Sequence, residues 1–198
     1  MATSLGRPPD GGPYGLAHGA RLDQKTFHER YERTPHGFHA ELIEGTVHVM
    51  SPLELDHGRH DVRFIGILFN YRVATPGTVA QATATAIMGD ASEPQPDSAS
   101  LIRDTHGGQT VDDVDGYMHG APELIVEVAF SSLSTDMRAK FRDYERAGVR
   151  EYVVYDGETG QVHWSVAERG HIPAPAGPRR RADPISGLPR PLVRPGRF

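Results

Sequence analysis

The stretch ELIVEVAF, residues 123–130, is nearly continuous in apolar residues, and it decides the fold. Such a run is typical of a strand that is covered on both faces at the centre of an α/β sheet. Glu127 interrupts the run. A carboxylate buried there without a partner would cost several kcal/mol or stay protonated. We therefore expect Glu127 to have a partner, which could be an internal cation, water or a metal ion.

Helical and strand patterns alternate on both sides of this central strand. Before it we expect a short helix that Asp23 caps, a hairpin turned at Glu44-Gly45, a helix and two strands, at residues 23–31, 38–50, 57–72, 78–88 and 97–102. After it we expect a helix that stops at Gly148 and two strands, at residues 135–147, 151–156 and 161–166. The pattern predicts an α/β (α+β) fold with one central mixed β-sheet flanked by helices.

Two helical faces can be read from the spacing of 100° per residue. In the helix over 57–72, the apolar face is expected to consist of Val62, Ile65, Leu68 and Phe69. In the helix over 135–147, one face carries Asp136, Lys140 and Tyr144, and an arginine stripe at 138, 142 and 146 points roughly the other way. The arginines are therefore expected to be solvated, and Lys140 lies at the edge of the buried side.

Length and composition limit the classes of protein. The 198 residues suit one domain, which we place at residues 23–170, between a disordered N-terminal extension (1–22) and a Pro/Arg-rich disordered tail (171–198). The absence of cysteine excludes disulfides, a thiolate nucleophile and a cysteine zinc site. With no long apolar run and no secretory signal, we expect a cytoplasmic protein that does not contact the membrane.

The net charge of −5 is unevenly distributed. From His171 to Phe198 there are six arginines and one aspartate, a net of +5, so residues 1–170 carry −10 with histidines neutral. An acidic body argues against a protein that coats nucleic acid by bulk charge. It leaves room for an enzyme that reaches phosphates through metal ions.

Asp97 and Glu127 form the first candidate site. Asp97 follows a proline at the start of a predicted strand, so it is expected at a strand end or bend. Two carboxylates at the rims of adjacent strands are a usual way to hold Mg²⁺ or Mn²⁺. The alternatives are a turn or cap role for Asp97 and an internal ion pair for Glu127.

Lys140 is unusual because the chain has only two lysines against nineteen arginines. A compact ammonium on a flexible stem can hydrogen-bond a water molecule or a phosphate oxygen without the fork geometry of a guanidinium. Lys140 is therefore a candidate for a chemical role. The alternative is a helical ion pair with Asp136, four residues earlier.

An ordered set of short segments resembles the Uma-two family, also known as domain of unknown function 820, in the PD-(D/E)XK nuclease-like superfamily. The segments are ELIEG (41–45), SPLELDHGRH (51–60), PQPD (94–97), GAPELIVEV (120–128), the Asp136–Lys140–Tyr144 spacing and AGVREYVVYD (147–156). The resemblance covers residues 23–168. It implies a restriction-endonuclease-like core.

The resemblance also implies roles for individual residues. Asp97 and Glu127 match the two acidic metal ligands, and Glu44 matches an early acidic residue that would contact the metal or its water. The usual lysine position, two residues after the second acid, is Ala129 here. Lys140 matches the lysine that has moved to the following helix, where it would orient the attacking water or help to deprotonate it.

These residues lead to a hypothesis of an Mg²⁺-dependent (or Mn²⁺-dependent) endonuclease acting on nucleic acid, with DNA as the expected substrate. His57 could be an accessory group near the site, or an ordinary residue at a helix start. A homodimer is a further expectation, because duplex cleavage needs two sites. The alternatives are a non-catalytic nuclease-fold module that binds nucleic acid or protein, and a hydrolase of another phosphoester.

Overall fold

A five-stranded mixed sheet forms the centre of the computed structural model, which describes residues 12–167 apart from residues 53, 113–114 and 131. Its strands, in the order β10–β9–β8–β5–β3, are β10 (Gln161–Val166), β9 (Glu151–Asp156), β8 (Leu124–Ala129), β5 (Ser98–Ile102) and β3 (Thr78–Ala82). β8 pairs antiparallel with β5 and parallel with β9. The apolar stretch thus forms the middle strand, and the predicted mixed sheet is confirmed.

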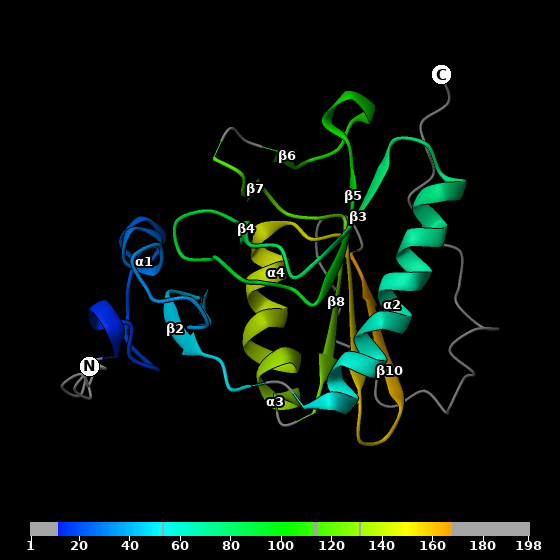
Figure 1. The fold of residues 1–198 in the computed structure, drawn as a ribbon. Helices are drawn as coiled ribbons and strands as arrows, with labels where there is room; N and C mark the ends of the chain where they lie inside the picture. Colours follow the sequence, from blue (N-terminus) through cyan, green and yellow to red (C-terminus); the bar gives the residue numbers. More distant parts are fainter. Residues whose placement is uncertain (1–11, 53, 113–114, 131, 168–198) are drawn as a thin grey trace, which may run out of the picture.

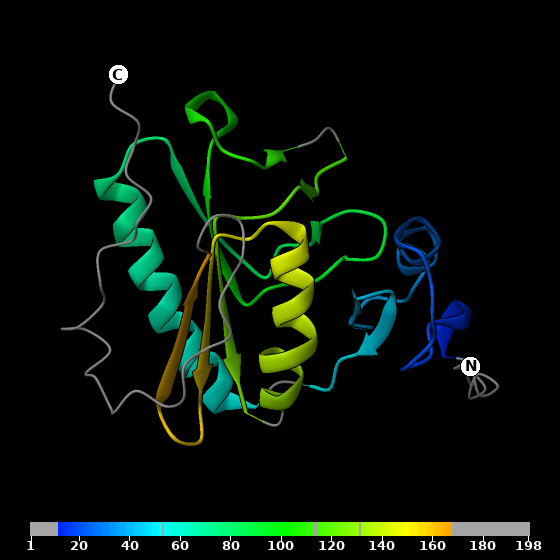
Figure 2. The ribbon, with the colours of Figure 1, turned by 180° about the vertical axis from the view of Figure 1, so that it is seen from behind.

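Helices cover both faces of this sheet (Figures 1 and 2). α2 (Leu55–Ala74) covers one face, and a helical segment made of α3 (Leu133–Thr135), η3 (Asp136–Lys140) and α4 (Phe141–Ala147) covers the other. Side chains of β8 alternate between the two layers. Val126 and Val128 pack toward α2, whereas Ile125 packs toward α4. Glu127, in phase with Ile125, therefore points toward α4.

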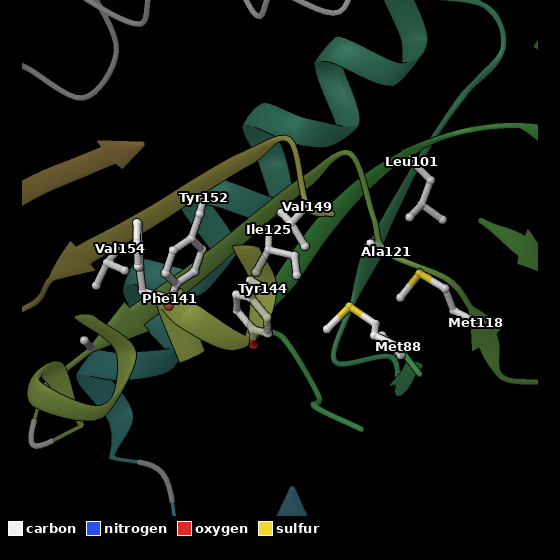
Figure 3. Close-up of a cluster of buried hydrophobic side chains, with 12 residues drawn as sticks. Met88, Leu101, Met118, Ala121, Ile125, Phe141, Tyr144, Val149, Tyr152 and Val154 are labelled. Carbon is white, nitrogen blue, oxygen red and sulfur yellow. The ribbon is translucent and has the colours of Figure 1, made fainter. Parts of the chain in front are cut away.

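The core on the α4 side contains aromatic side chains from neighbouring elements (Figure 3). Tyr144 of α4 lies edge-on to Tyr152 of β9, with ring centroids 5.0 Å apart, and Phe141 and Ile125 complete the group. Both tyrosines are at most 1% exposed. The helix over Glu127 is therefore held by packing on the sheet.

The helical segment from Leu133 to Ala147 contains a π-helical turn, η3. Such turns are rare and often occur at functional sites. α4 ends as expected at Gly148, whose φ of 93° is left-handed. Asp136, Lys140 and Tyr144 are buried, while the arginines at 138, 142, 146 and 150 are exposed. Both predicted faces of this helix are confirmed.

The face assigned to α2 is confirmed for Leu68 and is wrong for Val62 and Phe69. The helix buries Phe64 and Leu68 against the sheet, while Val62 is 61% exposed and Phe69 is 53% exposed. Apolar residues occur all round the helix between positions 62 and 69, so two faces are apolar and periodicity alone could not select the packed one.

The N-terminal part of the described chain packs beside α4. It contains a hairpin of β1 (Ala40–Ile43) and β2 (Thr46–Val49), and α1 (Gln24–Tyr31) precedes this hairpin in the chain. Asp23 caps α1 by accepting a hydrogen bond from Thr26 N at 2.8 Å. A short turn, η1 (Pro13–Gly15), precedes α1. Leu16 is fully buried against the hairpin, so residues 12–22 are not the disordered extension that we expected. Residues 1–11 and the expected tail from 171 lie outside the described residues.

The remaining strands are short. The strand expected over 78–88 is divided, because Thr83 adopts a φ of 51° after β3. The chain continues as β4 (Ala86–Ile87), which joins β7 (Met118–His119) and β6 (Val111–Asp112) in a small second sheet, and η2 (Asp104–His106) follows β5. Among the residues described, no helix combines the length and apolar character needed to cross a membrane.

A buried carboxylate fastens α4 to the loop between β4 and β5. Asp143 is 2% exposed and accepts a hydrogen bond from Ser92 Oγ at 2.6 Å. Burial raises the pKa of Asp143 to about 6, although the hydrogen bond from Ser92 acts in the opposite direction. Asp143 therefore ionises less readily in the folded state than in the unfolded chain.

Asp143→Asn should stabilise the protein at pH 7.5 by roughly 1–3 kcal/mol and leave its stability at pH 4 nearly unchanged. The pKa of Asp143 is higher in the folded state than in the unfolded chain. The wild type therefore loses stability as the pH rises from about 4 to about 6. Urea unfolding of both proteins at the two pH values measures the difference. A variant less stable than the wild type at pH 7.5 would contradict this assignment.

Candidate active site

The ammonium of Lys140 lies at the centre of three buried carboxylates. Its Nζ is 3.0 Å from Glu41 Oε2, 3.0 Å from Glu127 Oε1 and 3.6 Å from Asp136 Oδ1. The four side chains are at most 6% exposed. We call these four residues the Lys140 cluster. Its formal charge is −2 when all four groups are ionised.

Separate elements bring the cluster together. Glu127 comes from β8 and Glu41 from β1, while Asp136 and Lys140 are the first and last residues of η3. Asp136 Oδ2 accepts from Ser132 Oγ at 2.6 Å, so the turn before η3 fixes this carboxylate. The cluster thus connects the central strand, the hairpin and the helical segment.

Neutral donors hold the two glutamates. Tyr144 Oη donates to Glu127 Oε1 at 2.7 Å, and this oxygen also accepts from Lys140. The backbone N–H of Gln95 donates to Glu41 Oε1 at 2.7 Å. Tyr144, which was expected on the same helical face as Asp136 and Lys140 but was not predicted as a site residue, therefore positions Glu127.

Burial and charge act together on these groups. Burial raises the pKa of Glu127 well above its usual value, although the ammonium of Lys140 acts to lower it. The negative charges of Asp97, Asp136 and Glu41 raise this pKa further. Burial also raises the pKa of Asp136. For Lys140, burial alone would lower the pKa, but the surrounding carboxylates raise it well above its usual value. Lys140 is therefore a permanent cation.

Asp97 lies next to the cluster at the rim of the sheet. The pairing of Ser98 with Val126 ends the ladder between β5 and β8, so Asp97 comes beside Glu127. Asp97 Oδ2 accepts from Val128 N at 2.7 Å and lies 3.4 Å from His57 Nε2. The predicted strand-end position of Asp97 is observed, and the structure brings Asp97, Glu127, Lys140 and His57 into one region.

His57 is the first histidine of α2 and faces Asp97. The hydrogen bond to Asp97 raises the pKa of His57, although burial acts in the opposite direction. One helical turn later, Asp61 faces the same region. Burial, with the charge of Asp97, raises the pKa of Asp61 to about 6. Asp61 was not among the predicted site residues, because an aspartate in an amphipathic helix is usually solvated.

Glu44 does not join the Lys140 cluster. It sits in the hairpin turn with a φ of 49°, and its carboxylate accepts from Arg142 at 2.7 and 3.1 Å and from Arg146 at 3.0 Å. The hairpin residue that reaches Lys140 is Glu41. The signal that could have found Glu41 is the one that found Glu127, a charge inside an apolar strand.

The carboxylates of this site can be compared with the ligands that a divalent cation requires. No group of three or more histidine, aspartate or glutamate side chains in the described part of the chain is arranged as a metal site. Mg²⁺, however, usually keeps several waters and binds one or two carboxylates together with substrate phosphates. Asp97, just before β5, and Glu127, beside it on β8, supply two carboxylates, so they fit such a partly hydrated ion.

Lys140→Met should destabilise the protein by about 3–5 kcal/mol at pH 7.5, because three buried carboxylates lose their cation. The loss should shrink as pH falls, since burial already favours the protonated forms of Glu127 and Asp136. Arg138→Met, in the same turn but exposed, is the control and should change stability by less than about 0.5 kcal/mol. Equal denaturation midpoints for the two variants would mean that the cluster does not stabilise the fold.

Comparison with known proteins agrees with this architecture. No curated protein matches the chain. Among solved structures, the chain is similar to a protein from Anabaena variabilis described as "a putative nuclease belonging to DUF820", with a TM-score of 0.58 and 14% sequence identity over 71% of this chain and 79% of that one. At this identity the likeness shows a shared fold.

A family model described as "Putative restriction endonuclease" matches residues 25–187. This range covers most of the chain and contains every element that contributes to the Lys140 cluster. The chain therefore belongs to the Uma2 family.

Proposed function

We propose that the protein is an Mg²⁺-dependent (or Mn²⁺-dependent) endonuclease that hydrolyses phosphodiester bonds of nucleic acid, with DNA as its substrate. The observation that carries the proposal is that Asp97, Glu127 and Lys140 come together where β5 begins beside β8. Membership of the Uma2 family supports the nuclease class.

Asp97 and Glu127 would hold the metal ion. When bound, a divalent cation lowers the pKa of a coordinated water and draws negative charge from the phosphate. The side chain of Asp97 is 14% exposed and that of His57 is 12% exposed, whereas Glu127 and Lys140 lie deeper. A phosphate would therefore approach from the side of Asp97 and His57.

Lys140 would act as a fixed positive charge. Its pKa is raised by the carboxylates around it, so its ammonium keeps its proton at neutral pH. Such a group can orient a water molecule by donating a hydrogen bond and can stabilise negative charge, but it does not accept a proton. Of the two roles considered for Lys140, orientation is the one that this environment supports.

The remaining carboxylates would affect the position and the charge of Glu127. Glu41 and Asp136 share the ammonium with Glu127, so Glu127 is oriented without being fully neutralised. We propose His57 as an accessory group that supports Asp97, at a distance of 3.4 Å. Glu44, held by Arg142 and Arg146, takes no part in the proposed site.

A second candidate is a non-catalytic module with a nuclease fold that binds nucleic acid or protein. The observation in its favour is that Lys140 already contacts Glu41, Glu127 and Asp136, so the cluster is complete as an internal ion-pair network. In that case the network would serve stability alone.

Cleavage assays with Mg²⁺ or Mn²⁺ on duplex DNA, single-stranded DNA, RNA and a small phosphodiester separate these candidates. We expect cleavage of duplex DNA, and we expect Asp97→Asn and Glu127→Gln to reduce it by about 100-fold or more, since each removes a charge at the reacting phosphate. The control is Asp104→Asn, an exposed carboxylate outside the site, which should cut as the wild type does. Failure of the wild type on all four substrates would favour the non-catalytic module, and faster cleavage of the small phosphodiester would point to another phosphoester hydrolase.

A further inference from the structure

The outward face of α2 carries an exposed apolar stripe. Leu55, Val62, Phe69 and Val73 are exposed by 72%, 61%, 53% and 65%, and they are four of the seven large apolar side chains exposed in the described residues. We call these four residues the α2 stripe. Figure 1 shows α2 at the edge of the molecule, on the outer side of the sheet.

The stripe follows one line along the helix. Its spacings of seven, seven and four residues place the four side chains within about 40° of one another around the axis. They lie nearly opposite Phe64 and Leu68, which pack on the sheet. With residue areas of about 150–250 Å², the exposed part is on the order of 400 Å², which is the size of patches that mark interaction sites.

Two glycines adjoin the stripe. A Cβ atom at Gly58 or Gly66 would meet nothing within 4 Å. Glycine in an exposed helix interior costs about 1 kcal/mol relative to alanine, and nothing in the described structure requires it at these positions. Glycine does allow another backbone to approach closely. The α2 stripe therefore has bulky side chains and open positions along one line.

We propose that a second copy of this chain binds the α2 stripe, with the two α2 helices antiparallel and related by a two-fold axis that passes the stripe side of α2 at the level of residue 64. In such a pair, Leu55 of one copy lies opposite Val73 of the other, and Val62 lies opposite Gly66. Val62 of each copy thus fills the space above Gly66 of the other. This contact is made twice, as a closed two-fold interface requires. Arg59, which pairs with Asp56 at 2.7 Å, comes opposite the ring of Phe69, where an arginine is favourable.

Charge favours a second copy over the C-terminal segment of the same chain. The stripe is flanked by Arg59, Arg63 and Arg72, and the segment from 171 to 198 has six arginines and one aspartate. Like charge would oppose its docking on this face. α2 itself carries the exposed Asp56, which pairs with Arg59 at 2.7 Å, so the repulsion between two copies is smaller. Two α2 stripes, together with the aliphatic parts of the flanking arginines, would bury a surface area close to the roughly 1,200 Å² of a specific interface.

The pairing also bears on catalysis, and this step rests on the proposed function. His57 is near the start of α2, so a two-fold axis at the level of residue 64 separates the two His57 residues by about 20 Å along the helix axes. The dimer would then present two sites to one duplex. The pairing itself does not depend on activity.

Sedimentation equilibrium tests the dimer without metal or nucleic acid, so its outcome is independent of nuclease activity. At about 100 µM, above the micromolar dissociation constants of weak interfaces, the full chain should have twice its mass of 21.7 kDa. Val62→Glu should weaken the dimer by at least about 100-fold, since it buries two charges. Val111→Glu is the matched control, because Val111 is 53% exposed on another element, and it should remain dimeric.

Cysteine crosslinking tests the orientation, because the chain contains no cysteine. A mixture of Leu55→Cys and Val73→Cys chains should form a disulfide-linked dimer on oxidation, whereas Leu55→Cys alone should not. A wild type that is monomeric, or a Val62→Glu variant as dimeric as Val111→Glu, overturns the proposal and leaves the C-terminal segment or another protein as the occupant. Efficient crosslinking of Leu55→Cys alone overturns the antiparallel arrangement.

Discussion

The structure depends on one buried cation. Lys140 holds Glu41, Glu127 and Asp136 within 3.6 Å, and these residues come from the hairpin, the central strand and the helix that covers it. Without the ammonium, each of these elements would bury an unpaired carboxylate, which is among the most unfavourable events in a protein interior. The ion pairs therefore fix the position of the hairpin and of α4 on the sheet.

The surroundings of Lys140 explain how packing and chemistry share the same residues. The alternation of β8 sends Val126 and Val128 to the α2 core and Glu127 to the α4 side. The π-helical turn carries Asp136 and Lys140, and Tyr144 follows on the same face to bind Glu127. A small change in any of these contacts would move the carboxylate at the rim, so the stability of the core and the geometry of the proposed site are linked.

Much of this arrangement follows from the sequence. The central strand, the last two strands and the helix with buried Lys140 are predictable, because their apolar periodicity is strong and Gly148 ends the helix. Four features are not. Apolar residues surround α2, so its packed face depends on tertiary contacts. Leu16 is buried only because the hairpin offers a matching surface. The choice between Glu41 and Glu44 depends on the turn, which directs Glu44 toward the exposed arginines. The pairing of Lys140 with Glu127 and Glu41 required the structure, because these partners lie 13 and 99 residues away.

In the proposed site, Asp97 and Glu127 bind one metal ion beside an intact Lys140 cluster. Calorimetry with Mn²⁺ and Mg²⁺, in the absence of substrate, tests it most directly, with Glu44→Gln as the matched control. We expect the wild type and Glu44→Gln to bind metal, and we expect binding to be lost in both Asp97→Asn and Glu127→Gln. Without metal, Glu127→Gln should remain at least as stable as the wild type. Binding that survives in either of these two variants would contradict the claim, as would binding that is lost only in Glu44→Gln.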